Sequence, residues 1–284
     1  MRPLRKLVSL FSAAALTCGV GLASALPAAA ADSPAEILSA SWGLNNGTGC
    51  PKGPQGLDNL PVTFNWFIKT TSIDVTDFVI TRDDGSTTNP VCALQFPPNE
   101  RNEHQTINLI GDFGDPAGVR PVTITIAGEL QGHPVTKKRW QTIPAGLTHS
   151  VDQIEGGPYI ADAWTLTKKQ LAGDRNRCTV GKNFVRVAWS NGLTAFPDGT
   201  EVGDSVVNSY RAIFALPNGK TISVKPLALG DLGDHAKVAN NDNMHDLCLA
   251  ALPKGATLNA VSIGANQIQD PNGDPNEKQT LKIS

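Results

Sequence analysis

Apolar and polar residues alternate along much of this chain, and this pattern is typical of strands that are buried on one face. Val122, Ile124 and Ile126 fall on one side of such a run, while Thr123 and Thr125 fall on the other. Turn-forming residues interrupt these runs at short intervals, and no amphipathic helical pattern extends beyond a short stretch. The pattern predicts an all-β protein.

The chain also matches itself at an offset of about 120 residues. The segment PVTFNW at 61–66 matches FVRVAW at 184–189. Further along, FVITRDDGSTTNP at 78–90 matches AIFALPNGKTISVKP at 212–226, and each contains a DG or NG turn between two apolar runs. The match indicates two homologous domains.

The repeat also pairs three tryptophan or histidine positions: Trp42 with Trp164, Trp66 with Trp189, and His104 with His245. We interpret all six as structural residues. The tryptophans are expected to pack in the domain cores, because large aromatic side chains contribute much buried area. The histidines are expected to hydrogen-bond loop carbonyls, with a ligand or catalytic role as the alternative.

In the second repeat the pattern predicts seven strands, at 159–167, 184–190, 207–216, 221–229, 245–252, 258–268 and 279–284. About seven short strands in about 120 residues are typical of an immunoglobulin-like or fibronectin-like β-sandwich. We therefore predict two tandem sandwiches related by internal duplication, at 32–147 and 148–284. A fold class of this kind carries no function by itself.

The first 31 residues have the character of a cleavable secretory signal peptide. Arg2, Arg5 and Lys6 precede an apolar run at 7–26, and small residues follow up to Ala31. A membrane anchor is the alternative, because the run is long enough to span a bilayer. Its many small residues and the closing Ala-x-Ala pattern favour cleavage, and no later segment approaches membrane-spanning length.

Cleavage changes both the charge and the cysteine count. Without the three basic residues of the signal, 21 of the 24 basic residues remain against 26 acidic residues, a net charge of −5. This charge argues against a nucleic-acid partner. Four of the five cysteines remain, two in each repeat, so we predict the disulfides Cys50–Cys92 and Cys178–Cys248 in an extracellular or periplasmic protein.

No familiar catalytic motif is present. The chain lacks a G-x-S-x-G elbow, an H-E-x-x-H helix and a glycine-rich phosphate loop. None of the five histidines has a partner at metal-ligand spacing. With two tyrosines in the chain, a sugar-stacking platform is poorly supplied, and we expect Trp140, which has no repeat partner, to be buried.

Acidic residues concentrate in the loops at one predicted end of the second sandwich. The candidate ligands there are six oxygen-bearing residues: Asp242, Asp270, Asn272, Asp274, Asn276 and Glu277. The segment DPNGDPNE places an oxygen donor at every second position, a spacing that suits Ca²⁺, which takes 6 to 8 oxygen ligands. The alternative is an ordinary turn, since Asp, Asn, Gly and Pro are the common turn residues.

Two functions follow from these observations. The first is an exported, non-enzymatic protein for adhesion, envelope structure or recognition of an extracellular protein or glycan, with Ca²⁺ stiffening one loop pole. The second is a secreted metal-assisted hydrolase that uses the same acidic pole, with His245 as ligand or base. Activity that is lost on chelation and on His245→Ala would distinguish the second from the first.

Overall fold

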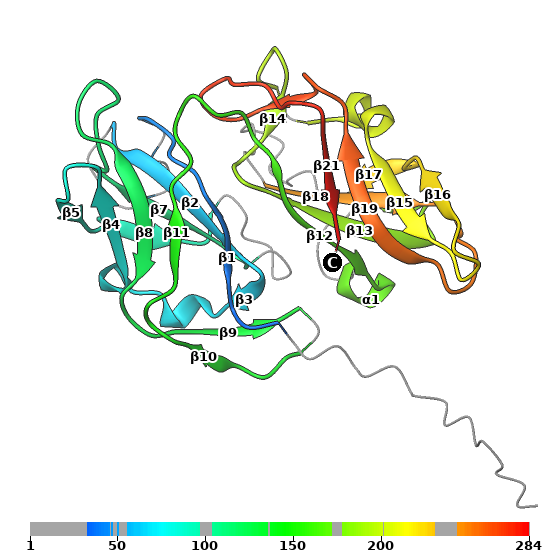
Figure 1. The fold of residues 1–284 in the computed structure, drawn as a ribbon, viewed down its shortest axis with the longest axis horizontal. Coiled ribbons are helices and arrows are strands. Elements are labelled where there is room, and N and C mark those ends of the chain that lie inside the picture. The colour runs from blue at the N-terminus through cyan, green and yellow to red at the C-terminus, as the bar shows by residue number, and fades with distance from the viewer. Residues whose placement is uncertain are drawn as a thin grey trace, which may run out of the picture. The chain divides into compact units, whose positions relative to one another are not determined.

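The computed structural model describes residues 33–45, 47, 50, 56–96, 104–135, 137–171, 178–200, 202–230 and 243–283. The predicted signal at 1–31 lies outside these residues. Within the described part, strands form several sheets and all paired strands are antiparallel, which confirms the all-β class (Figure 1).

The first half of the described chain, residues 33–151, contains three sheets. The first has the strand order β1 (Ile37–Ala40), β2 (Asp58–Phe64), β7 (Thr106–Gly111) and β6 (Cys92–Leu94). The second has the order β11 (Thr148–Ser150), β8 (Pro121–Ile126), β4 (Phe78–Arg82) and β5 (Thr87–Thr88). The third has the order β10 (Gln141–Ile143), β9 (Leu130–Pro134) and β3 (Trp66–Ile68).

The second half, residues 160–283, also contains three sheets. The first has the strand order β12 (Ile160–Leu166), β13 (Asn183–Trp189), β18 (Met244–Leu249) and β17 (Ala228–Gly230). The second has the order β16 (Thr221–Val224), β15 (Arg211–Ala215), β19 (Thr257–Ile263) and β21 (Gln279–Lys282). The third pairs β14 (Thr194–Ala195) with β20 (Ile268–Gln269).

Helices are short in the described part of the chain. They are α1 (Lys168–Leu171) and the 3₁₀ turns η1 (Thr70–Ser72), η2 (Val75–Asp77) and η3 (Asp204–Ser209). None of the described helices has the length and apolar character needed to cross a bilayer.

The two halves share one strand order when each is read along the chain. Strands β1, β2, β7 and β6 have the same neighbours as β12, β13, β18 and β17, and β4, β5, β8 and β11 correspond likewise to β15, β16, β19 and β21. An irregularity in pairing also recurs, after Ile37 in the β1–β2 pair and after Ile160 in the β12–β13 pair. Gly85 and Gly219, with φ of 83° and 77°, occupy the same place in the β4–β5 and β15–β16 turns, where only glycine adopts this conformation without strain.

The strand register corrects the tryptophan and histidine matches made from the sequence. Ile37 faces Phe64 across the β1–β2 pair, as Ile160 faces Trp189 across β12–β13, so the counterpart of Trp189 is Phe64. By the same comparison, the counterpart of His245, which pairs with Val187, is Ile107, which pairs with Val62. Trp66 and His104 are therefore not the counterparts of Trp189 and His245. Trp42 likewise lies one position away from the counterpart of Trp164.

Three of the seven strands predicted in the second half differ from the structure. The first residues of the segment 207–216 belong to η3, and β15 begins only at Arg211. The segment 221–229 divides into β16 and β17, which belong to different sheets. The segment 258–268 ends as a strand at Ile263 and resumes as β20.

Buried apolar side chains form two clusters with no member in common. One is drawn from residues 35–151 and includes Phe64, whereas the other is drawn from residues 160–268 and includes Trp189. Residues 33–284 nevertheless belong to one compact unit. Two cores are thus present, while the independence of two domains stays a prediction.

Both predicted disulfides are confirmed. Cys50 bonds to Cys92 over a separation of 42 residues, and Cys178 bonds to Cys248 over a separation of 70 residues. Both cross-links tie the segment between the first two strands of a half to the first sheet of that half. They reach different strands, β6 in the first half and β18 in the second.

Candidate functional site

The acidic segment between β20 and β21 is a tightly bonded turn around Asp270. This side chain is 3% exposed, and its Oδ1 accepts hydrogen bonds from the backbone N–H groups of Asn272 at 3.0 Å and Asp274 at 2.9 Å. Its Oδ2 accepts from Nδ2 of Asn272 at 3.2 Å. Burial raises the pKa of Asp270 to about 6, although the backbone donors act in the opposite direction.

Asn276 closes the other end of this turn and is 1% exposed. Its Oδ1 accepts from the backbone N–H groups of Gln267 at 2.8 Å and Ile268 at 3.1 Å, and its Nδ2 donates to the carbonyl oxygens of Gly264 at 2.7 Å and Glu277 at 2.9 Å. A single buried amide thereby satisfies four backbone groups of a chain reversal.

These bonds show that the predicted calcium segment forms a hydrogen-bonded turn. The oxygens of Asp270 and Asn276 accept N–H groups, while Glu277 is exposed and Asp274 is half-buried. Within the described ranges, no group of three or more His, Cys, Asp or Glu side chains is arranged to hold a metal ion. Asp242 lies outside the described residues. Ion binding by this segment stays a prediction.

His245 lies in the second core, not at a surface. It is 2% exposed, and its Nδ1 lies 2.7 Å from the hydroxyl oxygen of Tyr210, which accepts a hydrogen bond from Nε1 of Trp189 at 3.1 Å. The tyrosine hydroxyl thus links the indole N–H to the imidazole in one buried chain of hydrogen bonds. Burial lowers the pKa of His245 to about 3, so the ring is neutral at physiological pH.

His104 occupies a different environment. It is half-buried and precedes β7, and its carbonyl oxygen accepts from the backbone N–H of Ile68 at 2.6 Å. Its Nδ1 lies 3.5 Å from the hydroxyl of Thr70. The two histidines are therefore neither equivalent nor joined in one site.

The tryptophans lie mainly in the interior, as predicted. Trp42 is 1% exposed and donates from Nε1 to the buried carboxylate of Asp58 at 2.9 Å. Trp66 is 8% exposed and donates to the carbonyl oxygen of Ser33 at 3.0 Å. Trp164 on β12 is half-buried and its indole nitrogen has no hydrogen-bond partner.

A pocket of about 190 Å³ lies where the chain passes from the first half to the second. Its walls combine residues that follow β1, the connecting segment 152–159, the end of β13 and the acidic turn; the lining residues are Ser41, Trp42, Asp152, Gln153, Gly156, Gly157, Pro158, Tyr159, Ser190, Asn191 and Asp270. Asp270 and Trp42 are the two members singled out from the sequence, Asp270 as a candidate ligand and Trp42 as a structural residue. The others are common residue types whose proximity depends on how the two halves meet.

Asp152 is the centre of the hydrogen bonds in this pocket. Its Oδ2 accepts from the hydroxyl of Tyr159 at 2.9 Å and from the hydroxyl of Ser41 at 3.3 Å. Burial raises the pKa of Asp152, and burial beside this carboxylate raises the pKa of Tyr159. Among the described residues, no lysine, arginine or histidine lines the pocket, so its ionisable side chains are those of Asp152, Asp270 and Tyr159.

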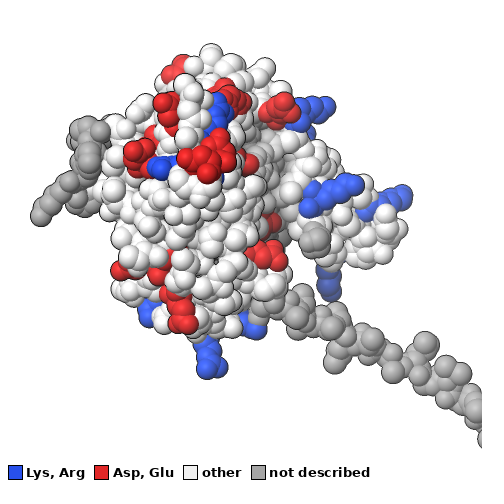
Figure 2. Space-filling view, turned by 60° about the vertical axis from the view of Figure 1, so that its left-hand side comes forward, with Lys and Arg blue, Asp and Glu red and all other residues white. Residues whose placement is uncertain are grey.

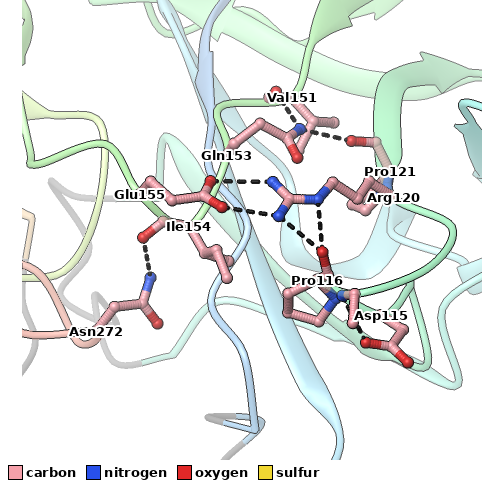
Figure 3. Close-up of polar contacts among 10 residues, drawn as sticks. Asp115, Pro116, Arg120, Pro121, Val151, Gln153, Ile154, Glu155 and Asn272 are labelled. Carbon is pink, nitrogen blue, oxygen red and sulfur yellow. Dashed lines mark hydrogen bonds and ion pairs between the residues drawn. The ribbon is translucent and has the colours of Figure 1, made fainter.

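Polar contacts hold the connecting segment to both halves (Figure 3). The guanidinium of Arg120 contacts both carboxylate oxygens of Glu155, at 2.8 and 3.1 Å, and Nε2 of Gln153 donates to the carbonyl oxygen of Pro121 at 2.8 Å. Asn272 of the acidic turn donates to the carbonyl oxygen of Ile154 at 3.4 Å. The acidic turn therefore supports the junction between the halves.

A scan against protein-family models, a search of curated proteins and a search of solved structures each found no match to this chain.

Proposed function

We propose that this chain is an exported, non-enzymatic protein made of two tandem immunoglobulin-like sandwiches, with a binding, adhesion or envelope-structural role. The common strand order and the pairing irregularity shared by Ile37 and Ile160 support duplication. In each half, the two four-stranded sheets have the connectivity expected of an immunoglobulin-like sandwich.

Export is supported by the cysteines and by the N-terminal sequence. All four cysteines after residue 31 form disulfides, which persist in oxidising compartments such as the periplasm and the extracellular space. The order of basic, apolar and small residues at 1–31 is that of a signal peptide. Disulfides and sequence together favour a secreted or periplasmic location.

The observation that carries the non-enzymatic assignment is the burial of His245. A general base must reach the proton that it abstracts, and this imidazole is enclosed between Tyr210 and Trp189. The hydrolase hypothesis assigned His245 as ligand or base beside the acidic turn. His245 is buried in the second core, and an oxygen of Asp270 in the acidic turn accepts two backbone N–H groups. Both observations count against the hydrolase hypothesis.

The test is to export the full chain and examine the mature protein. We expect its mass to correspond to removal of residues 1–31, and we expect no turnover on panels of ester, phosphate and glycoside substrates with or without added divalent cations. We also expect it to sediment with isolated envelope polymers. Turnover that is abolished by His245→Gln would refute the non-enzymatic assignment in favour of the hydrolase.

A further inference from the structure

The third sheet of the first half carries a row of aromatic rings on one face. Phe67 on β3 pairs with His133 on β9, and their ring centroids are 5.3 Å apart. Trp140 precedes β10 and lies beside His133 at a centroid distance of 4.6 Å. The three rings thus follow one another across neighbouring strands, and we call Phe67, His133 and Trp140 the aromatic row.

The opposite face of this sheet packs into the first core. Trp66 and Ile68 on β3 alternate with Phe67, and both belong to the first buried cluster, as do Leu130 on β9 and Ile143 on β10. Because side chains alternate between the two faces of a strand, the aromatic row points away from that core. The row is therefore carried by a sheet whose other face is anchored in the first core.

Trp140 is 44% exposed, contrary to the burial expected from the sequence, while Phe67 and His133 are half-buried. An aromatic side chain of this size is usually placed largely inside, so an exposed one beside two further rings marks a contact surface. The small number of tyrosines in the sequence did not predict the aromatic row, because the row consists of a tryptophan, a phenylalanine and a histidine.

Three basic residues precede Trp140 directly. Lys137, Lys138 and Arg139 are exposed, in a chain whose acidic residues outnumber its basic residues by 26 to 24. Figure 2 shows acidic and basic side chains close to one another over the upper part of the face that it presents, with a large uncharged area below them. Positive charge next to an aromatic face attracts an anionic ligand and holds it against the rings.

The described residues of the second half show no counterpart of this surface. The β14–β20 pair occupies the place of the β3–β9 pair in chain order, but no third strand from the described segments joins it. The connection that follows β20 is the acidic turn around Asp270, whereas the connection that follows β9 carries the three basic residues. The ring contacts found in the described part of the second half all lie among Trp189, Tyr210 and His245 in its core.

We propose that the aromatic row and the adjacent basic residues form a binding site for an anionic polysaccharide. The C–H faces of sugar rings pack on aromatic rings, and the carboxylate or phosphodiester groups of such a polymer pair with Lys138 and Arg139. This proposal deepens the binding role proposed above and depends on it. A membrane surface is less suited, because an inserting hairpin needs several exposed apolar side chains and Trp140 is the single large exposed one on this face among the described residues.

The experiment is electrophoresis of the intact mature protein through native gels that contain a polysaccharide. One gel holds polygalacturonate, one a glycerol-phosphate polymer bearing sugars, and one neutral dextran. We expect retardation by an anionic polymer and not by dextran, with the retardation decreasing as salt increases. The two anionic gels distinguish a carboxylate ligand from a phosphodiester ligand.

Two variants test the two parts of the site. Trp140→Ala should weaken binding by about tenfold or more, because tryptophan side chains commonly dominate binding surfaces. Lys138→Ala combined with Arg139→Ala should weaken it similarly and reduce its salt dependence. Leu227→Ala is the matched control, since Leu227 is 54% exposed and lies in the second half, and it should leave retardation unchanged. The melting temperature of each variant shows that its fold is retained.

Three results would overturn the proposal. They are the absence of retardation in both anionic gels, equal retardation of the intact protein and both site variants, and binding to vesicles of anionic phospholipid in place of the polysaccharides. If one of these results is obtained and no catalytic turnover is seen, the polysaccharide site is refuted but the proposed non-enzymatic role is not. Turnover by the unaltered protein would instead refute the proposed function itself.

Discussion

The two halves follow one strand order but differ in the chemistry of equivalent positions. In the first core, Phe64 and Ile107 are apolar. The equivalent residues of the second core are Trp189 and His245, which Tyr210 joins through hydrogen bonds. The comparison shows that this strand order requires large buried side chains at these two positions. Side chains with polar atoms are tolerated there when those atoms form hydrogen bonds.

The outer faces of the first sheets differ in the same way. Arg186 on β13 and Asp246 on β18 face each other across the strands, and the guanidinium donates to both carboxylate oxygens at 2.8 and 3.0 Å. Both side chains are fully buried. At the equivalent cross-strand pair of the first half, Pro61 faces Asn108, whose Oδ1 has no partner. The second half therefore depends on a buried charge pair that the first half does not need.

The largest expected effect comes from breaking this charge pair. Asp246→Ala removes the carboxylate that accepts two hydrogen bonds from the buried Arg186 guanidinium and should lower the free energy of unfolding by about 3 to 5 kcal/mol. Urea unfolding followed by circular dichroism measures the loss. Asn108→Ala, the matched change in the first half, should cost about 1 kcal/mol or less. Similar losses in both halves would contradict the contrast, and replacing the pair together, Arg186→Met with Asp246→Leu, should restore most of the stability.

The second prediction concerns acid. Since burial lowers the pKa of His245 to about 3, the folded protein resists protonating this ring while the unfolded chain protonates it near its ordinary pKa of 6.5. Its contribution to stability is fully present above about pH 6.5 and is lost as the pH falls toward 3, by roughly 5 kcal/mol at most. Urea unfolding at several pH values should show this slope in the intact protein. His245→Gln, which does not titrate, should flatten it; an unchanged slope would assign the acid sensitivity elsewhere.

The third prediction concerns the bonds between the halves. Asn243 is 1% exposed and donates from Nδ2 to the hydroxyls of Thr63 at 3.1 Å and Thr106 at 3.0 Å, as well as to the carbonyl oxygen of Trp189 at 3.1 Å. The equivalent residue, Gln105, donates to the carbonyl oxygen of Phe64 within its own half. Asn243→Ala should therefore cost about 2 kcal/mol in the whole protein, measured by thermal unfolding.

The predicted second domain, residues 148–284, sharpens this comparison. We expect this fragment to be soluble and to unfold cooperatively with a β-type spectrum, since it holds a complete core cluster. Asn243→Ala should have a smaller effect there than in the whole chain, because both threonine partners are missing. A fragment that does not fold would show that the two cores stabilise each other and that the domain boundary is wrong.

The smallest effect is expected at Asp270, with the opposite dependence on pH from His245. Burial raises the pKa of Asp270 to about 6 from an ordinary value of 3.8, so its contribution to stability is fully present below about 4 and is lost as the pH rises through 6. Asp270→Asn keeps an oxygen for the backbone N–H groups of Asn272 and Asp274 and should stabilise the protein by about 1 kcal/mol at pH 7. Thermal unfolding at pH 4 and pH 7 measures the difference, and a loss of stability at pH 7 would mean that the turn needs the charge.

Much of the architecture was predictable from local sequence signals. The period-two alternation around Ile124 identified β8, and the glycine turns at Gly85 and Gly219 identified the β4–β5 and β15–β16 hairpins. The even cysteine count, two to a repeat, led to the correct disulfide pairs. These signals are local because strand alternation, turn geometry and cysteine number are properties of short segments.

Other features could not be read from the chain alone. The match of Trp66 with Trp189 differed from the strand register by two positions, because identical residue types were aligned while the cross-strand partners were unknown. Asp270 has the same sequence character as a metal ligand, and only its burial and its bonds to Asn272 and Asp274 show that it supports a turn. Asp152 and Tyr159 carried no signal at all, since their pocket is formed by segments that are distant in sequence.

The sequence by itself determined the all-β class, the hairpin turns and the cysteine pairs, because each depends on residues whose spacing or number carries the information. The tertiary structure alone decided which polar residues became buried and which aromatic side chain reached the surface. Trp140 and Trp189 are the same residue type beside similar strand signals, yet Trp140 is 44% exposed and Trp189 is fully buried. The physical reason is that burial depends on what packs against the second face of a strand, and long-range chain contacts supply that neighbour.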